Sequence, residues 1–290
     1  MKDLTSPSYI SENIRKSGFF FKKNLGQNFL KESSVARKIV DSLELTGEEC
    51  VLEIGPGFGA LTGFLCGKAG KVIAVEIDHF AAGVLREALE DEANLEIVEQ
   101  DALKTDLLSL LYGREESYGA YKAVSNLPYN ITSPLIMRLL DIRPRLSSIV
   151  LMVQREVADR LAAPAGGKDY SSFTAQVRFL AECEKLFDVS KNSFMPVPGV
   201  DSAVMRLTPR ETPPVSVKSE TMMAEMIKAS FSMRRKTLAN CLSSYFRVDR
   251  GTASDLIVSA GIAPSARGET LDLADFARLA DAFHDAGIKR

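Results

Sequence analysis

Four short apolar runs in this sequence are each followed by a glycine or a polar residue that could contact a ligand. These residues are Gly55, Glu76, Asp101 and Asn126, and successive members are 21, 25 and 25 residues apart. Such spacing leaves room for one helix between neighbouring strands. Because the carboxyl ends of parallel strands meet at one edge of a sheet, we expect the four positions to line a single crevice.

The first of these positions belongs to a glycine turn with the sequence EIGPGFG at residues 53–59. Glycines let the backbone approach a ligand closely and let the following helix pack against its strand. Gly55, Gly57 and Ala60 also satisfy the loose G-x-G-x-x-G/A pattern, so a nicotinamide dinucleotide and an oxidoreductase function remain an alternative. A carboxylate at Glu76 could accept both hydroxyls of a ribose.

The last position opens the tetrapeptide Asn126-Leu127-Pro128-Tyr129, which suits chemistry on an exocyclic amine. The amino group of adenine is a poor nucleophile because its lone pair is conjugated into the ring. An amide oxygen and a carbonyl in a proline-restrained turn could accept its two N–H groups and favour a pyramidal nitrogen. An aromatic ring beside them could stack on an unpaired base.

Metal, disulfide and triad chemistry are disfavoured. A structural zinc site needs about four closely spaced sulfur or nitrogen ligands, which this chain does not offer. The scattered candidates are Cys50, Cys66, Cys183, Cys241, His79 and His284. We also find no apolar run of about 18–20 residues and no secretory signal, so a cytoplasmic protein without a membrane partner is expected.

Short apolar runs separated by helical segments predict a parallel sheet covered on both faces. The expected strands are residues 51–54, 72–76, 95–98, 121–125 and 149–153. Runs 173–177 and 203–207 alternate more strongly and are predicted as antiparallel edge strands. The 290 residues divide into an N-terminal segment (1–32), an α/β domain (33–208), a proline-rich linker (209–215) and a helical domain (216–290).

The formal net charge of −2 hides an asymmetry. Residues 44–106 carry a net charge of −10, which leaves +8 for the remainder. Basic residues gather at 15–38, including Lys22 and Lys23, and at 228–250. Such clusters on a nearly neutral protein can track a phosphate backbone while the acidic part faces solvent.

Five motifs, spread from about residue 20 to residue 238, resemble one known family. They are NLGQNFL at 24–30, EIGPGFG at 53–59, NLPYNITSP at 126–134, FMPVPGVDS at 194–202 and FSMRRKTL at 231–238. Together they are similar to the ribosomal RNA adenine N6,N6-dimethyltransferases of the KsgA type, which act on small-subunit RNA. The resemblance implies a Rossmann-like, class I S-adenosylmethionine-dependent methyltransferase domain with a smaller all-helical C-terminal domain.

The resemblance also implies roles for individual residues. The expected cofactor-binding set is Asn28, Leu30, Glu53, Gly55, Gly57, Glu76, Asp101, Ala102 and Asn126. The expected catalytic set is Asn126, Leu127, Pro128, Tyr129 and Phe194, with the two aromatic rings holding the flipped adenine. Lys22, Lys23, Arg234, Arg235 and Lys236 are expected to meet RNA phosphates.

The family's reaction would give N6,N6-dimethyladenosine at two adjacent adenosines in the 3′-terminal hairpin of 16S RNA, within an immature 30S subunit. A monomer with no obligate protein partner is expected. Two alternatives share the fold: the large-subunit enzymes that confer macrolide resistance, and non-catalytic assembly factors. Thr132-Ser133-Pro134 and the FSMRRK stretch favour the small-subunit enzyme, and an intact Asn126–Tyr129 tetrapeptide argues for catalysis.

Overall fold

The computed structural model describes residues 3–16, 28–112, 118–126, 129, 131–233 and 235–289. Its contacts divide the chain into two compact units. The first comprises residues 1–158 and 182–209, and the second comprises residues 159–181 and 210–290. This grouping differs from the predicted boundaries in one segment, because residues 159–181 pack with the C-terminal helices.

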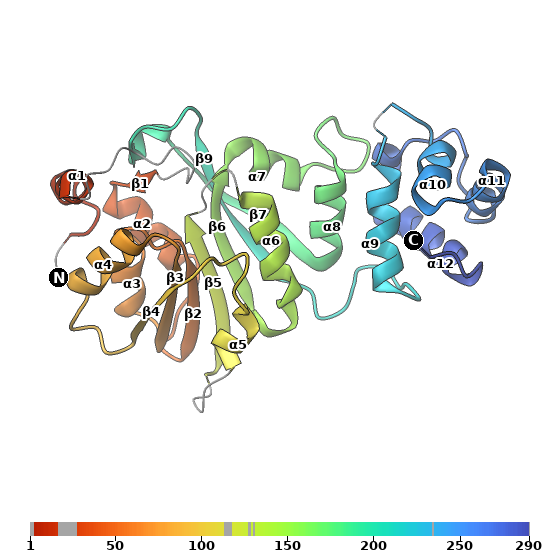
Figure 1. Ribbon diagram of the computed structural model, residues 1–290. Coiled ribbons are helices and arrows are strands. Elements are labelled where there is room, and N and C mark those ends of the chain that lie inside the picture. Colours follow the sequence, from red (N-terminus) through yellow and green to blue (C-terminus); the bar gives the residue numbers. More distant parts are fainter. Residues whose placement is uncertain are drawn as a thin grey trace. The chain divides into compact units, whose positions relative to one another are not determined.

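A seven-stranded sheet forms the centre of the first unit, in the order β4-β3-β2-β5-β6-β9-β7 (Figure 1). Its strands, in that order, are Leu95–Glu99, Lys71–Glu76, Glu49–Ile54, Ala120–Asn126, Ser148–Gln154, Ser202–Pro209 and Ala181–Val189. The five strands from β4 to β6 are parallel, and β9 runs antiparallel to β6. The predicted parallel α/β architecture is therefore confirmed.

The connections of this sheet reverse direction between β2 and β5. The chain moves outward from β2 through β3 to β4 and then returns to the other side of β2 at β5. Right-handed crossovers place the helices of the two halves on opposite faces, and a crevice opens at the reversal point. The helices of this unit are α1 (Pro7–Lys16), α2 (Ser33–Asp41), α3 (Thr62–Cys66), α4 (His79–Ala88), α5 (Leu107–Tyr112), α6 (Thr132–Asp141) and the start of α7 (Arg155–Ala162).

A separate two-stranded ribbon joins distant parts of the first unit. Strand β1 (Phe29–Leu30) pairs antiparallel with β8 (Phe194–Met195). The backbone N–H of Lys31 extends the ribbon by donating to the carbonyl of Ser193 at 2.9 Å. This pairing carries residues just before α2 to the carboxyl edge of the main sheet.

Helices build the second unit around an apolar core. They are α8 (Ser172–Leu180), α9 (Glu220–Ser230), α10 (Leu238–Phe246), α11 (Arg250–Ser259) and α12 (Leu273–Asp285). The core includes Met226, Leu242, Phe276 and Phe283, each at most 1% exposed. Side chains of Ser219, Asp249 and Asp272 accept hydrogen bonds at the starts of α9, α11 and α12, which stabilises the first turn of each helix. No helix in the described part of the chain is long and apolar enough to cross a bilayer.

Two secondary-structure predictions need correction. Residues 173–177, predicted as an edge strand, lie in α8, where Ala175 and Phe179 join the helical core and Ser171 caps the first turn by accepting from the Thr174 N–H. Residues 203–207 do form an antiparallel strand, but β9 is internal because β7 pairs outside it. Strand β7 escaped prediction because its exposed positions carry charged residues such as Glu182 and Glu184, which weaken the apolar signal.

Candidate active site

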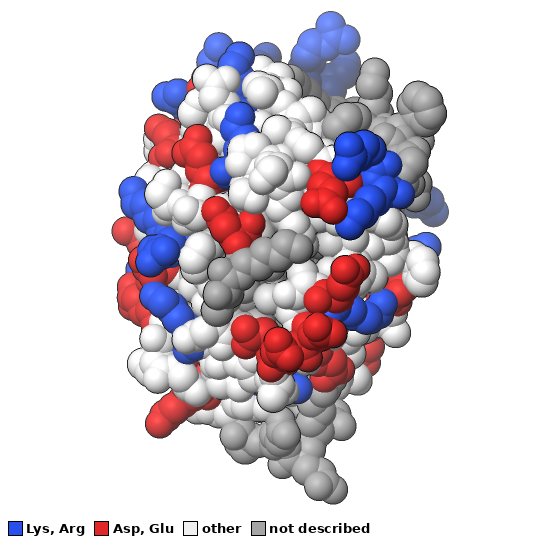
Figure 2. All heavy atoms as spheres, turned by 90° about the vertical axis from the view of Figure 1, so that its left-hand side faces the viewer, with Lys and Arg blue, Asp and Glu red and all other residues white. Residues whose placement is uncertain are grey.

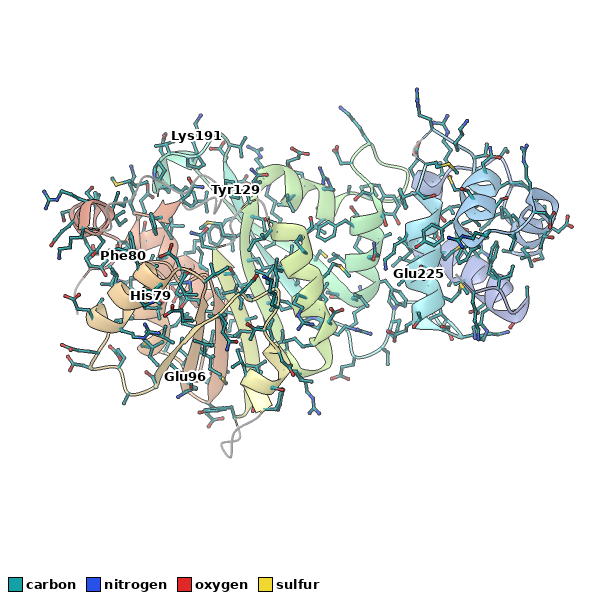
Figure 3. The ribbon with its side chains drawn as sticks, in the orientation of Figure 1. His79, Phe80, Glu96, Tyr129, Lys191 and Glu225 are labelled. Carbon is teal, nitrogen blue, oxygen red and sulfur yellow. The ribbon has the colours of Figure 1, made fainter. Side chains whose placement is uncertain are left out.

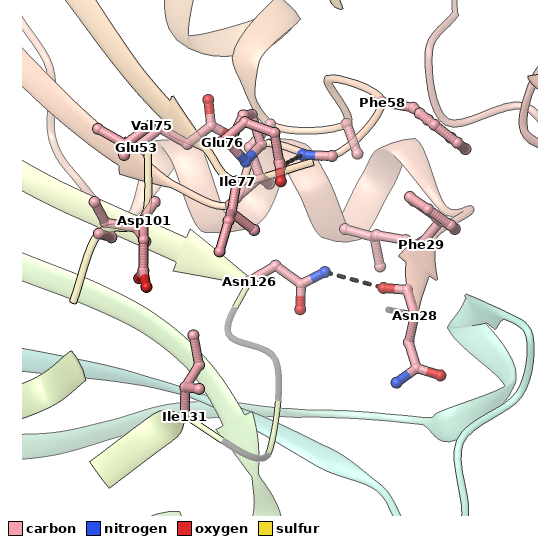
Figure 4. A pocket seen from close by; sticks show the side chains of 18 of the residues that line it. Asn28, Phe29, Glu53, Phe58, Val75, Glu76, Ile77, Asp101, Asn126 and Ile131 are labelled. Carbon is pink, nitrogen blue, oxygen red and sulfur yellow. Dashed lines mark hydrogen bonds between the residues drawn. The ribbon is translucent and has the colours of Figure 1, made fainter. Parts of the chain in front are cut away.

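A pocket of about 210 Å³ lies at the carboxyl ends of the parallel strands in the first unit. The four strand-end positions singled out in the sequence, Gly55, Glu76, Asp101 and Asn126, all line it. Figure 4 labels the last three of them. The four positions follow β2, β3, β4 and β5, the strands on both sides of the reversal point. The pocket therefore occupies the position where open α/β sheets bind their ligands.

The glycine turn forms one wall of this pocket in a backbone conformation that side chains disfavour. Gly55, Gly57 and Gly59 have φ angles of 68°, 56° and 91°. The amide of Gly55 donates to the carbonyl of Val75 at 2.9 Å, which ties the turn to β3. Glycine is needed here for the positive φ, and the missing side chains leave the backbone open to a ligand.

Glu76 is a buried carboxylate that holds the turn. Its side chain is 4% exposed, and its two oxygens accept from the backbone amides of Gly57 at 3.0 Å and Asp78 at 2.9 Å. Burial raises the pKa of Glu76, and these two hydrogen bonds act against the shift. Because each carboxylate oxygen can accept more than one hydrogen bond, both can still receive the hydroxyls of a ribose.

Glu53 lines the same pocket and is 1% exposed. Within the described residues its Oε2 atom has no hydrogen-bond partner. Burial raises the pKa of Glu53 to about 8. A buried carboxyl with an unpartnered oxygen beside a cavity fits a cationic ligand, since a nearby positive charge stabilises the ionised form.

The end of β4 contributes a second acid. Oδ1 of Asp101 accepts from the Leu103 amide at 2.9 Å, and Ala102 beside it also lines the pocket. Across the pocket lies Ile77, which is 54% exposed although it is apolar. The sequence analysis missed Ile77, although an aliphatic residue between two acids at a strand end was an available signal. Its exposed side chain offers a flat contact for an aromatic ring.

Asn126 is oriented by the segment that precedes β1. Its Nδ2 donates to the backbone carbonyl of Asn28 at 3.3 Å (Figure 4). Its amide oxygen accepts no hydrogen bond from any residue that the structure describes. Leu30 also lines the pocket from β1. The arrangement leaves an acceptor at the strand tip for a group that donates N–H.

Tyr129, which lies between β5 and α6, is labelled in Figure 3 and also lines the pocket. Its hydroxyl lies 2.9 Å from Oγ of Ser202, and burial raises the pKa of the phenol. Leu127 and Pro128 lie outside the described residues. The ring is thus attached to β9 by its hydroxyl and is available to stack on a planar group.

Phe194 differs from the sequence-based expectation in its position. The side chain is 1% exposed and packs in the core with Leu30, Val189 and Val204. It is not among the residues that line the pocket. The structure therefore does not bring Phe194 together with Tyr129 around one cavity, and its stacking role stays a prediction.

The predicted RNA contacts are placed only in part. Lys22, Lys23 and Arg234 lie outside the described residues. Arg235 and Lys236 are exposed just before α10. Across the described residues, no three His, Cys, Asp or Glu side chains are grouped as a metal site, and the four cysteines are free thiols.

Comparison with known proteins identifies the family. The profile of the family described as "Ribosomal RNA adenine dimethylase" matches residues 18–285. The chain belongs to this dimethylase family. The dimethylase is 43% identical over 284 residues to "Ribosomal RNA small subunit methyltransferase A" of Geobacillus thermodenitrificans, with 97% of each chain covered. It is also 43% identical to the protein of the same name from Enterococcus faecalis, covering 97% of this chain and 96% of that one.

Solved structures agree with this family. A dimethyladenosine transferase from Plasmodium falciparum has a TM-score of 0.74 and 29% identity, covering 89% of this chain and 98% of that one. The 23S rRNA methyltransferase ErmE has a TM-score of 0.64 and 28% identity, covering 89% and 100%. The fold is thus a Rossmann-like methyltransferase fold, and the dimethylase is an rRNA adenine dimethyltransferase that uses S-adenosylmethionine. Membership of this family rules against the oxidoreductase alternative.

The pocket fits this methyl donor on three observations. The turn lacks side chains that would block a ligand's approach, Glu53 has a buried unpartnered oxygen for a cationic group, and Glu76 can accept from a ribose. The donor supplies a methyl group already activated by a positively charged sulfur. No metal and no covalent enzyme intermediate are required for that transfer, so the protein's task is alignment.

Proposed function

We propose that this dimethylase methylates N6 of two adjacent adenosines in the 3′-terminal hairpin of small-subunit (16S) ribosomal RNA, giving N6,N6-dimethyladenosine. The names of relatives at 43% identity over nearly the whole chain support the choice of the small subunit. The large-subunit alternative is supported less, because ErmE is only 28% identical. An immature 30S particle is the proposed substrate, bound by a cytoplasmic monomer that acts in small-subunit biogenesis.

In this proposal the strand tips hold the methyl donor. Glu53 faces its cationic amino-acid end, next to the glycines Gly55 and Gly57. Glu76 accepts from the ribose hydroxyls, and Asp101 accepts from the adenine amino group. Asn28, Leu30 and Ala102 complete the set, and Ile77 supports the adenine ring.

The single observation that carries the catalytic proposal is the amide oxygen of Asn126. It lies in the same pocket as Glu76 and Asp101, and its amide nitrogen is fixed by the carbonyl of Asn28 at 3.3 Å. An acceptor held in this way can take an N–H of the target amine and draw its lone pair out of conjugation. Leu127 and Pro128 are proposed to supply and restrain a second carbonyl acceptor, while Tyr129 stacks on the flipped base.

The domains predicted from the sequence are proposed to divide the work. Residues 33–208 carry out the transfer, residues 1–32 contribute to both cofactor and RNA contacts, and residues 216–290 bind the ribosomal particle after a linker at 209–215. Lys22, Lys23 and the Arg234–Lys236 cluster are the proposed phosphate contacts. The exposure of Arg235 and Lys236 supports this assignment.

The test offers isotopically labelled S-adenosylmethionine with immature small subunits or immature large subunits. We expect incorporation into small-subunit RNA only, mapped to two adjacent adenosines. Asn126→Ala should lower the rate at least 100-fold while affinity for the particle changes less than fivefold. Gln176→Ala serves as control, since within the described part of the chain that amide bonds only to Ser172 on its own helix. Methyl incorporation into the large subunit alone, or an unchanged rate for Asn126→Ala, would refute the proposal.

A further inference from the structure

We infer that residues 3–16, with helix α1 at their centre, form a wall of the cofactor pocket whose docking and cofactor binding stabilise each other. This inference rests on the proposed assignment of the pocket to the methyl donor. The family profile begins matching only at residue 18. Yet Leu4 and Ile10, which precede that point, line the same pocket as Glu76 and Asn126.

The wall is held mainly by apolar contacts. Leu4, Tyr9 and Ile10 are 5%, 6% and 1% exposed. They pack in one cluster with Phe29 and Phe58, whose rings stack at 4.1 Å between centroids and 4° between planes. Phe58 belongs to the glycine turn and Phe29 to β1, so the wall rests on two elements that line the cofactor pocket.

Leu4 lies directly against the turn itself. A Cβ atom placed on Gly59 would lie 2.9 Å from Cδ1 of Leu4, and one placed on Gly63 would lie 3.5 Å from the same atom. Withdrawal of Leu4 would therefore remove van der Waals contact from the turn that carries Gly55 and Gly57. The turn and the wall thus support each other before any ligand contact is considered.

Two polar contacts connect the wall to the glycine turn and to strand β8. The Tyr9 hydroxyl donates to the carbonyl of Phe58 at 3.5 Å, and burial raises the pKa of that phenol to about 12, so it stays protonated as a donor. Oγ of Ser11 donates to Sδ of Met195 in β8 at 3.4 Å. Helix α1 thereby bridges the cofactor turn and the ribbon that precedes the proline-rich loop.

The helix is too short to be stable when detached. It has 10 residues, and isolated helices of that length are marginal in water. Docking therefore orders α1, and a ligand that contacts Leu4 and Ile10 binds the docked state better than the undocked state. Thermodynamic linkage makes the coupling reciprocal. The factor by which docking of α1 raises the affinity for the ligand equals the factor by which the bound ligand raises the equilibrium constant for docking.

The first experiment measures the affinity of the full-length protein for S-adenosylhomocysteine by titration calorimetry. We expect Ile10→Ser to weaken binding at least tenfold and Tyr9→Phe to weaken it two- to fivefold. Ser8→Ala, on the exposed side of the same helix, should bind as the wild type does. An affinity for Ile10→Ser within twofold of the wild type would overturn the inference.

The second experiment follows amide hydrogen exchange in the wild type, so it does not depend on any variant folding. S-adenosylhomocysteine should slow exchange in α1 at least fivefold and leave exchange in α12 unchanged. Equal exchange in α1 with and without the ligand would overturn the coupling.

The variant Asp101→Ala separates the inference about α1 from the assignment of the pocket. If the wild-type protein binds S-adenosylhomocysteine and this variant binds it equally well, the pocket assignment fails. If Asp101→Ala weakens binding but Ile10→Ser does not, the pocket assignment stands and only the inference about residues 3–16 is refuted.

Discussion

Glu53 is the residue whose chemistry departs furthest from its ordinary behaviour. It is 1% exposed in a β-strand, one of its oxygens has no partner among the described residues, and burial raises its pKa to about 8. In the ligand-free protein the carboxyl is therefore mostly protonated at neutral pH. A positive charge brought into the pocket would favour the ionised form, so cofactor binding and proton release from Glu53 are coupled.

The raised pKa of Glu53 predicts that the stability of the protein depends on pH. Between the ordinary carboxyl pKa near 4.5 and the native value of about 8, the folded protein holds a proton on Glu53 that the unfolded chain does not. The contribution of this proton to the free energy of unfolding is complete below pH 4.5, falls as the pH rises, and is lost above about pH 8. Glu53→Gln should therefore remove a slope of up to about 1.4 kcal/mol per pH unit from the free energy of unfolding. Denaturant titrations at pH 5.5, 6.5 and 7.5 measure it.

A smaller slope of the same sign should remain in Glu53→Gln, because burial also raises the pKa of Glu76. The wild type and the variant are compared without ligand, since a bound cation would shift Glu53 toward its ionised form. Equal slopes for the two proteins would mean that Glu53 is ionised in the folded state at neutral pH.

The polar pocket residues could be predicted from their positions in the sequence, whereas several apolar ones could not. Glu76, Asp101 and Asn126 stand out because a polar side chain at the end of a buried strand costs free energy unless it has a hydrogen-bond partner or a ligand. Leu4 and Ile10 look like ordinary core residues, and only the fold shows that one side of each meets a cavity. Phe194, for which a motif suggested a stacking ring, is a buried side chain that does not line this cavity, and its stacking role stays a prediction.

At the scale of elements, the glycine turn tolerates little change. Gly59 combines a φ of 91° with a hypothetical Cβ that would lie 2.7 Å from Cδ1 of Leu85 and 2.9 Å from Cδ1 of Leu4. Both backbone strain and steric overlap would result from any side chain. The ends of the Leu85 and Leu4 side chains would have to move away from the turn.

We therefore expect Gly59→Ala to lower the free energy of unfolding by about 1–3 kcal/mol. Gly199→Ala is the matched control, since a Cβ there would meet nothing within 4 Å and no positive φ is involved. Thermal unfolding of the two variants beside the wild type measures the difference. Equal melting temperatures for all three would contradict the steric argument.

The parallel strands were predictable because most of them are nearly continuous apolar runs. Strands β2, β3 and β6 are buried on both faces, whereas β4 is only partly buried. Helix α8 was not predictable, since Phe173, Ala175, Val177 and Phe179 alternate with polar residues as they would in a strand, and tertiary packing decided for a helix. Strand β1 has two residues and gains its only described partner from β8, so no local signal could have revealed it. Long-range pairing of this kind is the part of the fold that sequence patterns do not contain.

For the whole molecule, charge distribution matters more than net charge. Residues 44–106, which contribute β2 to β4, carry a net charge of −10. Figure 2 views the molecule from the side of α1 and shows acidic side chains gathered near the middle of this face, with basic side chains around them. Phosphate groups would be repelled from such a surface, which directs RNA toward other parts of the protein.

The exposed pair Arg235 and Lys236 offers a direct test. Arg235→Glu combined with Lys236→Glu should weaken association with small-subunit RNA about tenfold near 0.1 M salt and lower the slope of log K against log salt by about two. Cofactor affinity should be unchanged, because both residues lie in the second unit and the pocket lies in the first. Lys68→Glu, within the acidic region and paired with Asp41, is the control. An unaltered salt slope would make the cluster an ordinary solvated surface.

The β1–β8 ribbon has a consequence for the order in which the enzyme becomes competent during synthesis. Phe29 and Leu30 line the pocket but obtain their strand partners only from Phe194 and Met195. A short strand has little stability before its partner exists. We therefore expect a nascent chain to remain unable to retain the methyl donor until residue 195 has emerged from the translating ribosome, although every strand tip of the parallel sheet is already made by residue 154.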